Sequence, residues 1–285
     1  MKKFTTTVSA AALLALTATA GMASSILIDD FSGTGQSVSV ANTATGAKDG
    51  NTVVDGDVLG GSRGLAIITD PSALTGTPND IGNAKLEVNT SALGGVLNFS
   101  NDSLQTTTGV IVYNGSGAST TTPDIVDTSP ADGLADFTID ITSPFDGISA
   151  ADFGVSSFGL GADLTGVSGE LDKFFFEVLD SDLNINIGIF AYNSAGALIG
   201  AYGEDLSLGF SPFAEFSAFT GGTGDFTDVG ALVFAVQNDP NSPVDGLVGS
   251  ISVVPLPASA LLLLGGLGGF AGLSAASRRR RRKEA

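Results

Sequence analysis

Carboxylate and amide side chains are the groups in this sequence that can do chemistry, because the usual catalytic residues are missing. The chain of 285 residues contains no His and no Cys. Without imidazole or thiol groups, the Ser-His-Asp and Cys-His catalytic arrangements and the common zinc sites cannot be built. The carboxylates that remain point to two kinds of chemistry: acid–base catalysis and the binding of calcium.

Two oxygen-rich turns are candidates for calcium, which takes six to eight oxygen ligands. They are Asp55-Gly56-Asp57 and the run Asn238–Asn241, which is followed by Asp245. We also expect Asp29 or Asp30 to approach Asp245, because the first and last strands of jelly rolls often lie side by side. Asp, Asn and Gly are ordinary turn residues as well. We therefore expect ordinary turns and no cofactor, and a structural calcium ion is the alternative.

Catalysis by a carboxylate pair finds little support. A glycosidase needs two carboxylates at a defined separation across a cleft. Glu is rare between residues 24 and 253, and no pair can be placed from the sequence. The segment Asp180–Asn184 begins like a helix–loop–helix calcium site, but Ile185 and Ala191 stand where that site needs Gly and Glu. We therefore predict that the protein is not an enzyme.

Arg63 and the aromatic residues are the remaining candidates for binding. Arg63 is the one Arg between residues 24 and 253, and we expect it to pair with a carboxylate and fix the turn after Gly60-Gly61. The alternative is that it grips a carboxylate or sugar ligand. Sugar sites usually stack rings on Trp or Tyr, and this chain has no Trp and three Tyr. The tyrosine candidates are Tyr113, Tyr192 and Tyr202, whereas Phe174–Phe176, Phe210, Phe213, Phe216 and Phe219 are expected in the core.

The charge balance excludes one class of partner. Residues 24–253 contain four basic and 29 acidic residues, a net charge of −25. A surface this acidic repels phosphate backbones, so we expect no nucleic-acid partner. It suits a soluble extracellular protein or one that collects divalent cations.

The elements that position these residues are predicted to be strands. Short runs rich in Val, Ile and Phe are bounded by Gly, Asn, Asp, Pro and Ser, as in a two-sheet β-sandwich or jelly roll. The predicted strands are 25–30, 64–69, 85–89, 96–99, 110–113, 137–141, 173–179, 183–190, 197–202, 215–219, 231–237 and 247–253. Residues Tyr192–Gly196 are predicted to form a hairpin turn, and 115–133 a long loose loop, or alternatively a functional one.

One strand shows the expected period. Leu183, Ile185, Ile187 and Ile189 alternate with polar or small residues, which predicts one buried and one solvent-facing side. The segments Leu27–Ser32, Leu59–Arg63 and Ala162–Thr165 also resemble β-sandwich proteins of the galactose-binding or lectin-like jelly-roll kind. That resemblance implies a sandwich fold.

The sequence patterns at the two ends of the chain indicate segments that direct export. Lys2 and Lys3 precede an apolar run from Val8 to Thr19 and small residues up to Ala23. This is the pattern of a signal peptide over residues 1–23, cleaved after Ala23 or alternatively after Ala20. Residues 259–277 carry no charge and are long enough to span a bilayer as a helix. A basic tail, 278–285, follows and is expected in the cytoplasm; its cluster is Arg278, Arg279, Arg280, Arg281 and Arg282.

A short proline-containing motif separates the body, residues 24–253, from the span. It is Val254, Pro255, Leu256, Pro257 and Ala258. Motif, apolar span and arginine cluster together resemble the PEP-CTERM class of sorting signals, in its VPLPA variant. The resemblance covers the end of the chain from Val254 onward.

The resemblance implies a membrane-embedded exosortase as processing partner, and association with exopolysaccharide or biofilm matrix. It also implies a protein held transiently in the inner membrane by its C-terminal helix and then exposed at the cell surface or outside the cell. A simple tail anchor is the alternative for the C-terminal segment. For the body, the expected role is structural and non-catalytic, and a calcium-assisted carbohydrate-binding module is the alternative.

Overall fold

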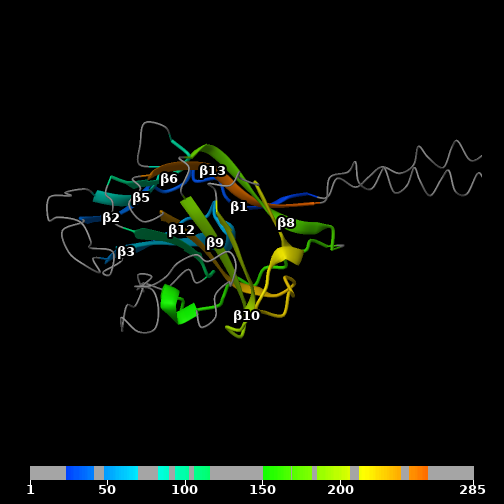
Figure 1. The fold of residues 1–285 in the computed structure, drawn as a ribbon. Coiled ribbons are helices and arrows are strands. Elements are labelled where there is room, and N and C mark those ends of the chain that lie inside the picture. Colours follow the sequence, from blue (N-terminus) through cyan, green and yellow to red (C-terminus); the bar gives the residue numbers. More distant parts are fainter. Residues whose placement is uncertain are drawn as a thin grey trace, which may run out of the picture.

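The computed structural model describes residues 24–41, 48–69, 83–89, 94–102, 106–115, 150–167, 169–181, 185–205, 212–238 and 244–255. Within these ranges the chain forms β-strands joined by turns and short 3₁₀ helices. Two antiparallel sheets lie face to face as two layers (Figure 1). The prediction of an all-β sandwich body is therefore confirmed.

The first sheet has the strand order β11-β8-β13-β6-β5-β2, and β1 pairs with β13 in addition. Its strands are β1 (Ile26–Asp29), β2 (Gln36–Ala41), β5 (Asn83–Val88), β6 (Leu97–Asn101), β8 (Leu171–Ser181), β11 (Phe213–Glu215) and β13 (Val244–Pro255). The second sheet has the order β10-β9-β12-β7-β4-β3. Its strands are β3 (Lys48–Val54), β4 (Ser62–Thr69), β7 (Thr107–Tyr113), β9 (Ile185–Asn193), β10 (Leu198–Asp205) and β12 (Val229–Asn238).

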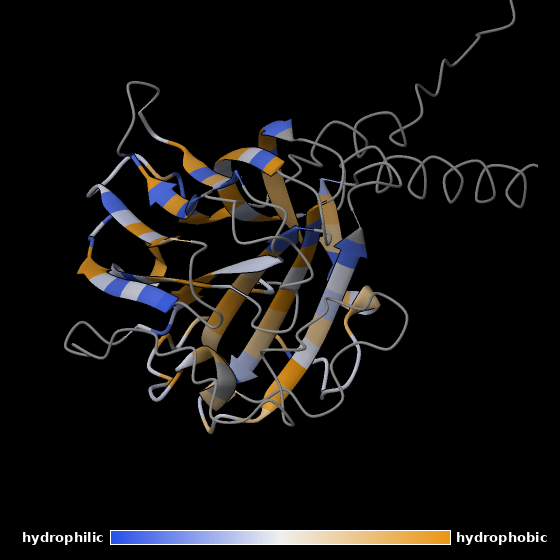
Figure 2. Ribbon diagram, turned by 60° about the vertical axis from the view of Figure 1, so that its left-hand side comes forward, coloured by the Kyte–Doolittle hydropathy of each residue, from blue (hydrophilic) through white to orange (hydrophobic). Residues whose placement is uncertain are grey.

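The first sheet has one buried and one solvent-facing side. In β2 the side chains of Val38 and Val40 are buried, whereas Ser37 and Ser39 are exposed. This alternation follows from the two-residue period of a strand, whose successive side chains point to opposite faces. Figure 2 shows the same alternation as bands of hydrophobic and hydrophilic colour along several strands. The buried sides of the two sheets form the main apolar core.

The central strands of the second sheet are covered on both sides. All residues of β4 and β7 are buried. A second apolar cluster covers the side away from the main core, and Phe153 and Val155 contribute to it beside the 3₁₀ helix η2 (Ala150–Phe153). The predicted solvent-facing side of β9 is therefore wrong, since Asn186 and Gly188 are buried there.

Most of the predicted strands that fall in the described ranges are present, with shifted ends. The strands β2 and β3 were not predicted. The predicted strand 215–219 is wrong, because β11 ends at Glu215 and the 3₁₀ helix η4 (Phe216–Ala218) follows. The hairpin between β9 and β10 is confirmed, and the Asn193 side chain accepts hydrogen bonds from the amides of Ala195 and Ala197 there.

Several predicted segments lie outside the described residues. They are the signal peptide 1–23, the strand 137–141, the loop 115–133 beyond Gly115, the span 259–277 and the basic tail 278–285. Among the described residues, no helix is both long enough and apolar enough to cross a bilayer.

Candidate functional site

A buried polar cluster around Arg63 joins the two sheets. Arg63 lies near the start of β4, directly after the 3₁₀ helix η1 (Leu59–Gly61). Gly60 and Gly61 have φ angles of 79° and 77°, which only Gly adopts readily. A Cβ atom on Gly60 would also lie 2.8 Å from the Cα atom of Gly115, so this turn requires Gly on two grounds. The turn sends the Arg63 side chain into the protein, where none of it is exposed to solvent.

Every nitrogen of the Arg63 guanidinium has a partner within the chain. Nη1 donates to Oδ2 of Asp29 at 2.7 Å, and Nε donates to Oε1 of Gln36 at 3.0 Å. Nη2 donates to the carbonyl oxygen of Thr34 at 2.8 Å and lies 3.9 Å from Oδ2 of Asp55. A buried charge is stable only when it is paired and hydrogen-bonded in this way.

Asp29 is the centre of the negative side of the cluster. Its Oδ2 also accepts a hydrogen bond from the Tyr113 hydroxyl at 2.9 Å, and its Oδ1 accepts one from the amide of Phe31 at 2.7 Å. Burial raises the pKa of Asp29, and the positive charge of Arg63 opposes this rise. The same burial, with the charge of Asp29 beside it, raises the pKa of Tyr113 well above its ordinary value.

Asp55 closes the turn between β3 and η1 and does not form an open metal site. Its Oδ2 accepts a hydrogen bond from the amide of Thr34 at 2.7 Å, and its Oδ1 accepts one from the amide of Asp57 at 3.1 Å. The first predicted calcium turn is thus an ordinary side-chain-capped turn. The prediction that Arg63 pairs with a carboxylate is confirmed, and its alternative as a ligand-gripping residue is wrong because the side chain is enclosed.

Asp29 and Asp245 are not brought together, and residues 239–241 of the second oxygen-rich turn lie outside the described residues. The first and last strands do lie side by side, but Asp29 is opposite Ile251 and Asp245 is opposite Ser100 of β6. Along β13, Asp245 is therefore about 20 Å from Ile251, the residue opposite Asp29. Asp30 accepts hydrogen bonds from Ser32 instead, which lower its pKa. Within the described ranges, no three carboxylates gather as a metal site would require.

The tyrosines do not form a platform for sugar rings. Tyr113 and Tyr192 are buried in the two apolar clusters. Tyr202 is half-buried, its ring is stacked on Phe219 at 5.6 Å between centroids, and its hydroxyl donates to Oε2 of Glu204 at 2.8 Å. Burial and the Glu204 carboxylate raise its pKa above the ordinary range.

A row of exposed and half-buried apolar side chains crosses the outer side of the first sheet, and sequence reasoning missed it. Leu27 is opposite Ser252, Ser252 is opposite Phe175, and Phe175 is opposite Phe213. Residues directly opposite in antiparallel strands share one side of the sheet. Leu27 and Phe213 are 46% and 39% exposed, so the prediction that Phe213 belongs to the core is wrong. We call Leu27, Phe175 and Phe213 the outer apolar row.

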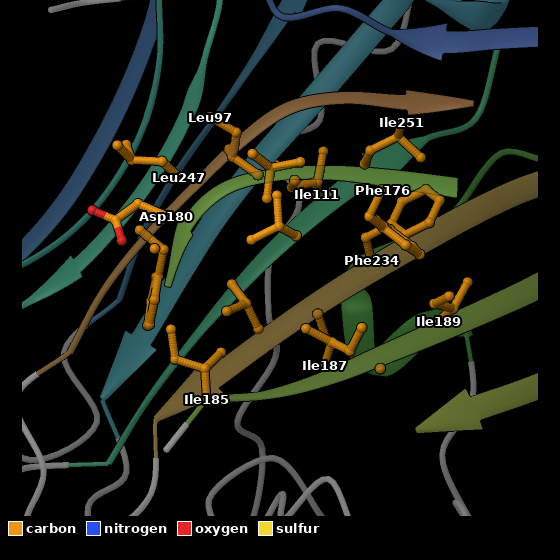
Figure 3. Close-up of a pocket in the computed structure, with 17 residues that line it drawn as sticks. Leu97, Ile111, Phe176, Asp180, Ile185, Ile187, Ile189, Phe234, Leu247 and Ile251 are labelled. Atoms are coloured by element: carbon orange, nitrogen blue, oxygen red, sulfur yellow. The ribbon is translucent and has the colours of Figure 1, made fainter. Parts of the chain in front are cut away.

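A cavity of about 70 Å³ lies between the two sheets (Figure 3). Its walls are apolar side chains of β6, β7, β8, β9, β12 and β13, such as Ile187, Phe176 and Phe234. Of the described residues that line it, Asp180 is the one that carries a charge, and it is exposed at the rim. A catalytic pocket needs several converging polar groups. The described lining of this cavity offers space for a small apolar group.

The residues of the expected sorting motif begin within β13. Val254 and Pro255 are the last two residues of β13, whereas Leu256, Pro257 and Ala258 lie outside the described residues, as does the arginine cluster 278–282. The body therefore extends two residues beyond the boundary expected at 253.

No family model matches the chain, and no curated protein matches it. A solved structure with similarity is the family 11 carbohydrate-binding module of the cellulosomal cellulase Lic26A-Cel5E of Clostridium thermocellum. It matches with a TM-score of 0.29 and 12% sequence identity over 83% of this chain and 97% of that one. At this score the likeness has no bearing on ligand or activity.

Proposed function

We propose that this chain is an exported, non-catalytic surface or matrix protein that is sorted through its C-terminal signal. The observation that carries the proposal is the pairing of β1 with the end of β13, in which Ile26 is opposite Val253. The residues that follow the expected signal peptide and those that precede the expected membrane span thus lie side by side. The described residues nearest to the two expected membrane-directed segments therefore lie at the same end of the sandwich.

The interior of the body supports a structural role. The charged groups of the buried cluster around Arg63, namely Asp29, Arg63 and Asp55, bind one another or the backbone. The apolar cavity lacks converging polar groups. We therefore assign the body to the architecture of the cell surface or the exopolysaccharide matrix and not to catalysis.

Cell fractionation of a bacterium that makes both the full chain and an exosortase tests this proposal. The expected result is a surface-exposed or released body without its arginine cluster. A variant in which Leu256, Pro257 and Ala258 are all Gly should stay in the inner membrane at full length, whereas the matched control Glu284→Gln should behave as the native chain. Surface delivery of the Gly variant at the native level, or retention of the arginines on the surface-exposed native chain, would contradict the proposal.

Binding of exopolysaccharide is the second candidate. The observation that favours it is the outer side of the first sheet, where Ser37, Ser39 and Lys85 are exposed and Asn98 and Ser100 are half-buried. Hydroxyl and amide groups of this kind hydrogen-bond to sugar hydroxyls. Co-sedimentation with the host's own exopolysaccharide, with and without calcium, tests it. Equal sedimentation by the native chain and by a variant with Ser37, Ser39 and Ser100 changed to Val would rule out this side as the binding surface.

A further inference from the structure

Each sheet is divided by one central strand into strands from the N-terminal part of the chain and strands from its middle. In the first sheet β2, β5 and β6 lie on one side of β13, and β8 and β11 lie on the other (Figure 1). In the second sheet β3, β4 and β7 lie on one side of β12, and β9 and β10 lie on the other. We call β2 to β7 the N-terminal group and β8 to β11 the middle group.

The two central strands make the join between these groups in both sheets. On one edge β13 pairs with β6 and β1, and on its other edge it pairs with β8. In the same way β12 pairs with β7 on one edge and with β9 on the other. Among the described strands, none of the N-terminal group pairs with one of the middle group. The joining strands are also the last two of the described strands in chain order.

The apolar core depends on the same two strands. The ring centroid of Phe234 in β12 lies 5.9 Å from that of Tyr113 in the N-terminal group and 5.8 Å from that of Phe176 in the middle group. Val253 of β13 is fully buried in the same apolar cluster. Without β12 and β13, apolar side chains of both groups lose their cover and meet water, which is unfavourable.

The buried ion pair depends on β13 as well. Asp29 lies on β1, and β1 pairs with β13 and with no other strand among those that the structure describes. Its partner Arg63 lies in the N-terminal group, and the Arg63 side chain is fully enclosed. A buried guanidinium that lacks its carboxylate is strongly destabilising. The N-terminal group therefore needs β13, which positions β1, to complete the surroundings of Arg63.

We propose that β12 and β13 close the fold in its last step, so that neither group is stably folded before these strands are available. Before closure, β6, β7, β8 and β9 present edges without their native partners. Long chains generally fold their N-terminal part first during synthesis, whereas here the N-terminal group has to wait for the C-terminal strands. The inference does not depend on the proposed function. For an exported protein it has the consequence that the body stays unfolded until its whole length is available.

Limited proteolysis with chymotrypsin, which cuts after aromatic residues, tests the proposal. The substrates are the full chain in mild detergent and a chain that ends at Asn238 and so lacks β13. Phe99 in the N-terminal group and Phe190 in the middle group are both buried. In the shortened chain both are expected to be cut at least ~100-fold faster than in the full chain, because cleavage follows the population of the open state. Protection of either residue at the level of the full chain would overturn the proposal, since one group would then fold without the join.

A matched pair of proline variants tests the same point in the full chain. Ser252 of β13 has a partner on each edge, Leu27 and Phe175 of the outer apolar row, so Ser252→Pro removes a hydrogen bond of a central strand. Ser39 lies on the edge strand β2, and its amide donates to the Asp49 carboxylate and not to the sheet, so Ser39→Pro leaves the pairing intact.

The two variants are expected to differ in how fast chymotrypsin cuts them. Ser252→Pro should speed cutting at least ~100-fold at Phe99 and Phe190 alike, whereas Ser39→Pro should change it by less than ~10-fold. Faster cutting of Ser252→Pro in one group alone would overturn the proposal, because the groups would then open independently. Equal acceleration by the two variants would overturn it too, because β13 would then hold no special place.

Discussion

The carboxylate of Asp29 and the guanidinium of Arg63 are 2.7 Å apart and neither is exposed to solvent by more than 1%. Asp29 belongs to the first sheet and Arg63 to the second, so this ion pair joins the two layers of the sandwich. Tyr113 and Gln36 extend the same connection through hydrogen bonds. The interior of this sandwich is therefore held partly by directional polar contacts in addition to apolar packing.

Substitution of Arg63 is expected to destabilise the protein strongly. Arg63→Ala leaves Asp29 buried without its partner, which costs about 3–5 kcal/mol in the free energy of unfolding. Arg63→Lys keeps the charge but cannot reach Asp29, Gln36 and Thr34 at once, and is expected to cost about 1–3 kcal/mol. Urea unfolding measures both. The control Lys85→Ala, at an exposed position of β5, should change the value by less than about 0.5 kcal/mol. Equal stability of Arg63→Ala and the control would refute the role of the cluster.

The free energy of unfolding is expected to fall above pH 10 because the pKa of Tyr113 differs between the folded and unfolded chain. Its pKa in the folded protein is raised well above the ordinary value of 10.0 by burial and by Asp29. Above pH 10 the unfolded chain loses this proton while the folded chain keeps it, so rising pH favours unfolding by up to about 1.4 kcal/mol per unit. Urea midpoints between pH 8 and pH 11 should fall less steeply for Tyr113→Phe. Parallel pH profiles for the two proteins would show that Tyr113 is not the source.

Gly230 and Gly56 differ in the space that each leaves for an added Cβ atom. A Cβ atom on Gly230, in β12, would lie 2.5 Å from the carbonyl oxygen of Asn193, and backbone cannot move aside cheaply. Gly230→Ala is therefore expected to cost about 2 kcal/mol or more. Gly56 has no atom within 4 Å of such a Cβ, so Gly56→Ala should be neutral or stabilise by up to about 1 kcal/mol. Thermal unfolding of both variants measures this difference. Equal changes in the two melting temperatures would contradict the prediction.

Filling the cavity between the sheets is expected to stabilise the fold. Val236 lines this cavity, and Val236→Ile adds one methylene where space exists. The expected gain is about 0.5–1 kcal/mol. Val54→Ile, at a side chain that is 68% exposed, is the control and should gain nothing measurable. A loss of stability in Val236→Ile would mean that the cavity cannot accept the added group.

Calcium is expected to leave the melting temperature of the body unchanged. Asp29 is used by Arg63, and Asp245 lies on another part of the sheet, so they cannot share an ion. Melting in the presence of calcium and of a chelator measures this. A calcium ion contributing 1 kcal/mol or more would raise the midpoint by about 2–4 °C in a domain of this size. Such a rise would mean that calcium is bound by residues other than Asp29 and Asp245.

The strands that could be predicted are those with a strong local signal. The segments that became β4, β7 and β12 carry continuous runs of Val, Ile and Ala, and such runs are typical of strands covered on both sides. In contrast, the edge strand β3 is rich in Asp, Gly and Asn, which are typical of turns. The edge strand β2 has a clear alternation of Ser and Val, which the prediction overlooked, and it pairs with β5, more than 40 residues later. The polar side predicted for β9 was wrong because Phe153 and Val155 cover it, and no pattern within β9 indicates that.

The polar cluster could be predicted only in part. A single Arg in an acidic body must find a carboxylate partner, and that expectation needed no structure. The choice of Asp29, 34 residues earlier, depends on how the two sheets stack. For Asp245 the neighbouring strands were predicted correctly, but the register that separates it from Asp29 was not, because register depends on long-range pairing.

The position of β13 in the middle of the first sheet also sets how the body responds to mechanical force. A force applied at Pro255 along β13 acts parallel to the axis of this strand, and the hydrogen bonds of the strand to β8 and β1 stand across that axis. The bonds are therefore loaded together in shear and do not open one after another. A body tethered at this end resists drag through its most firmly held strand.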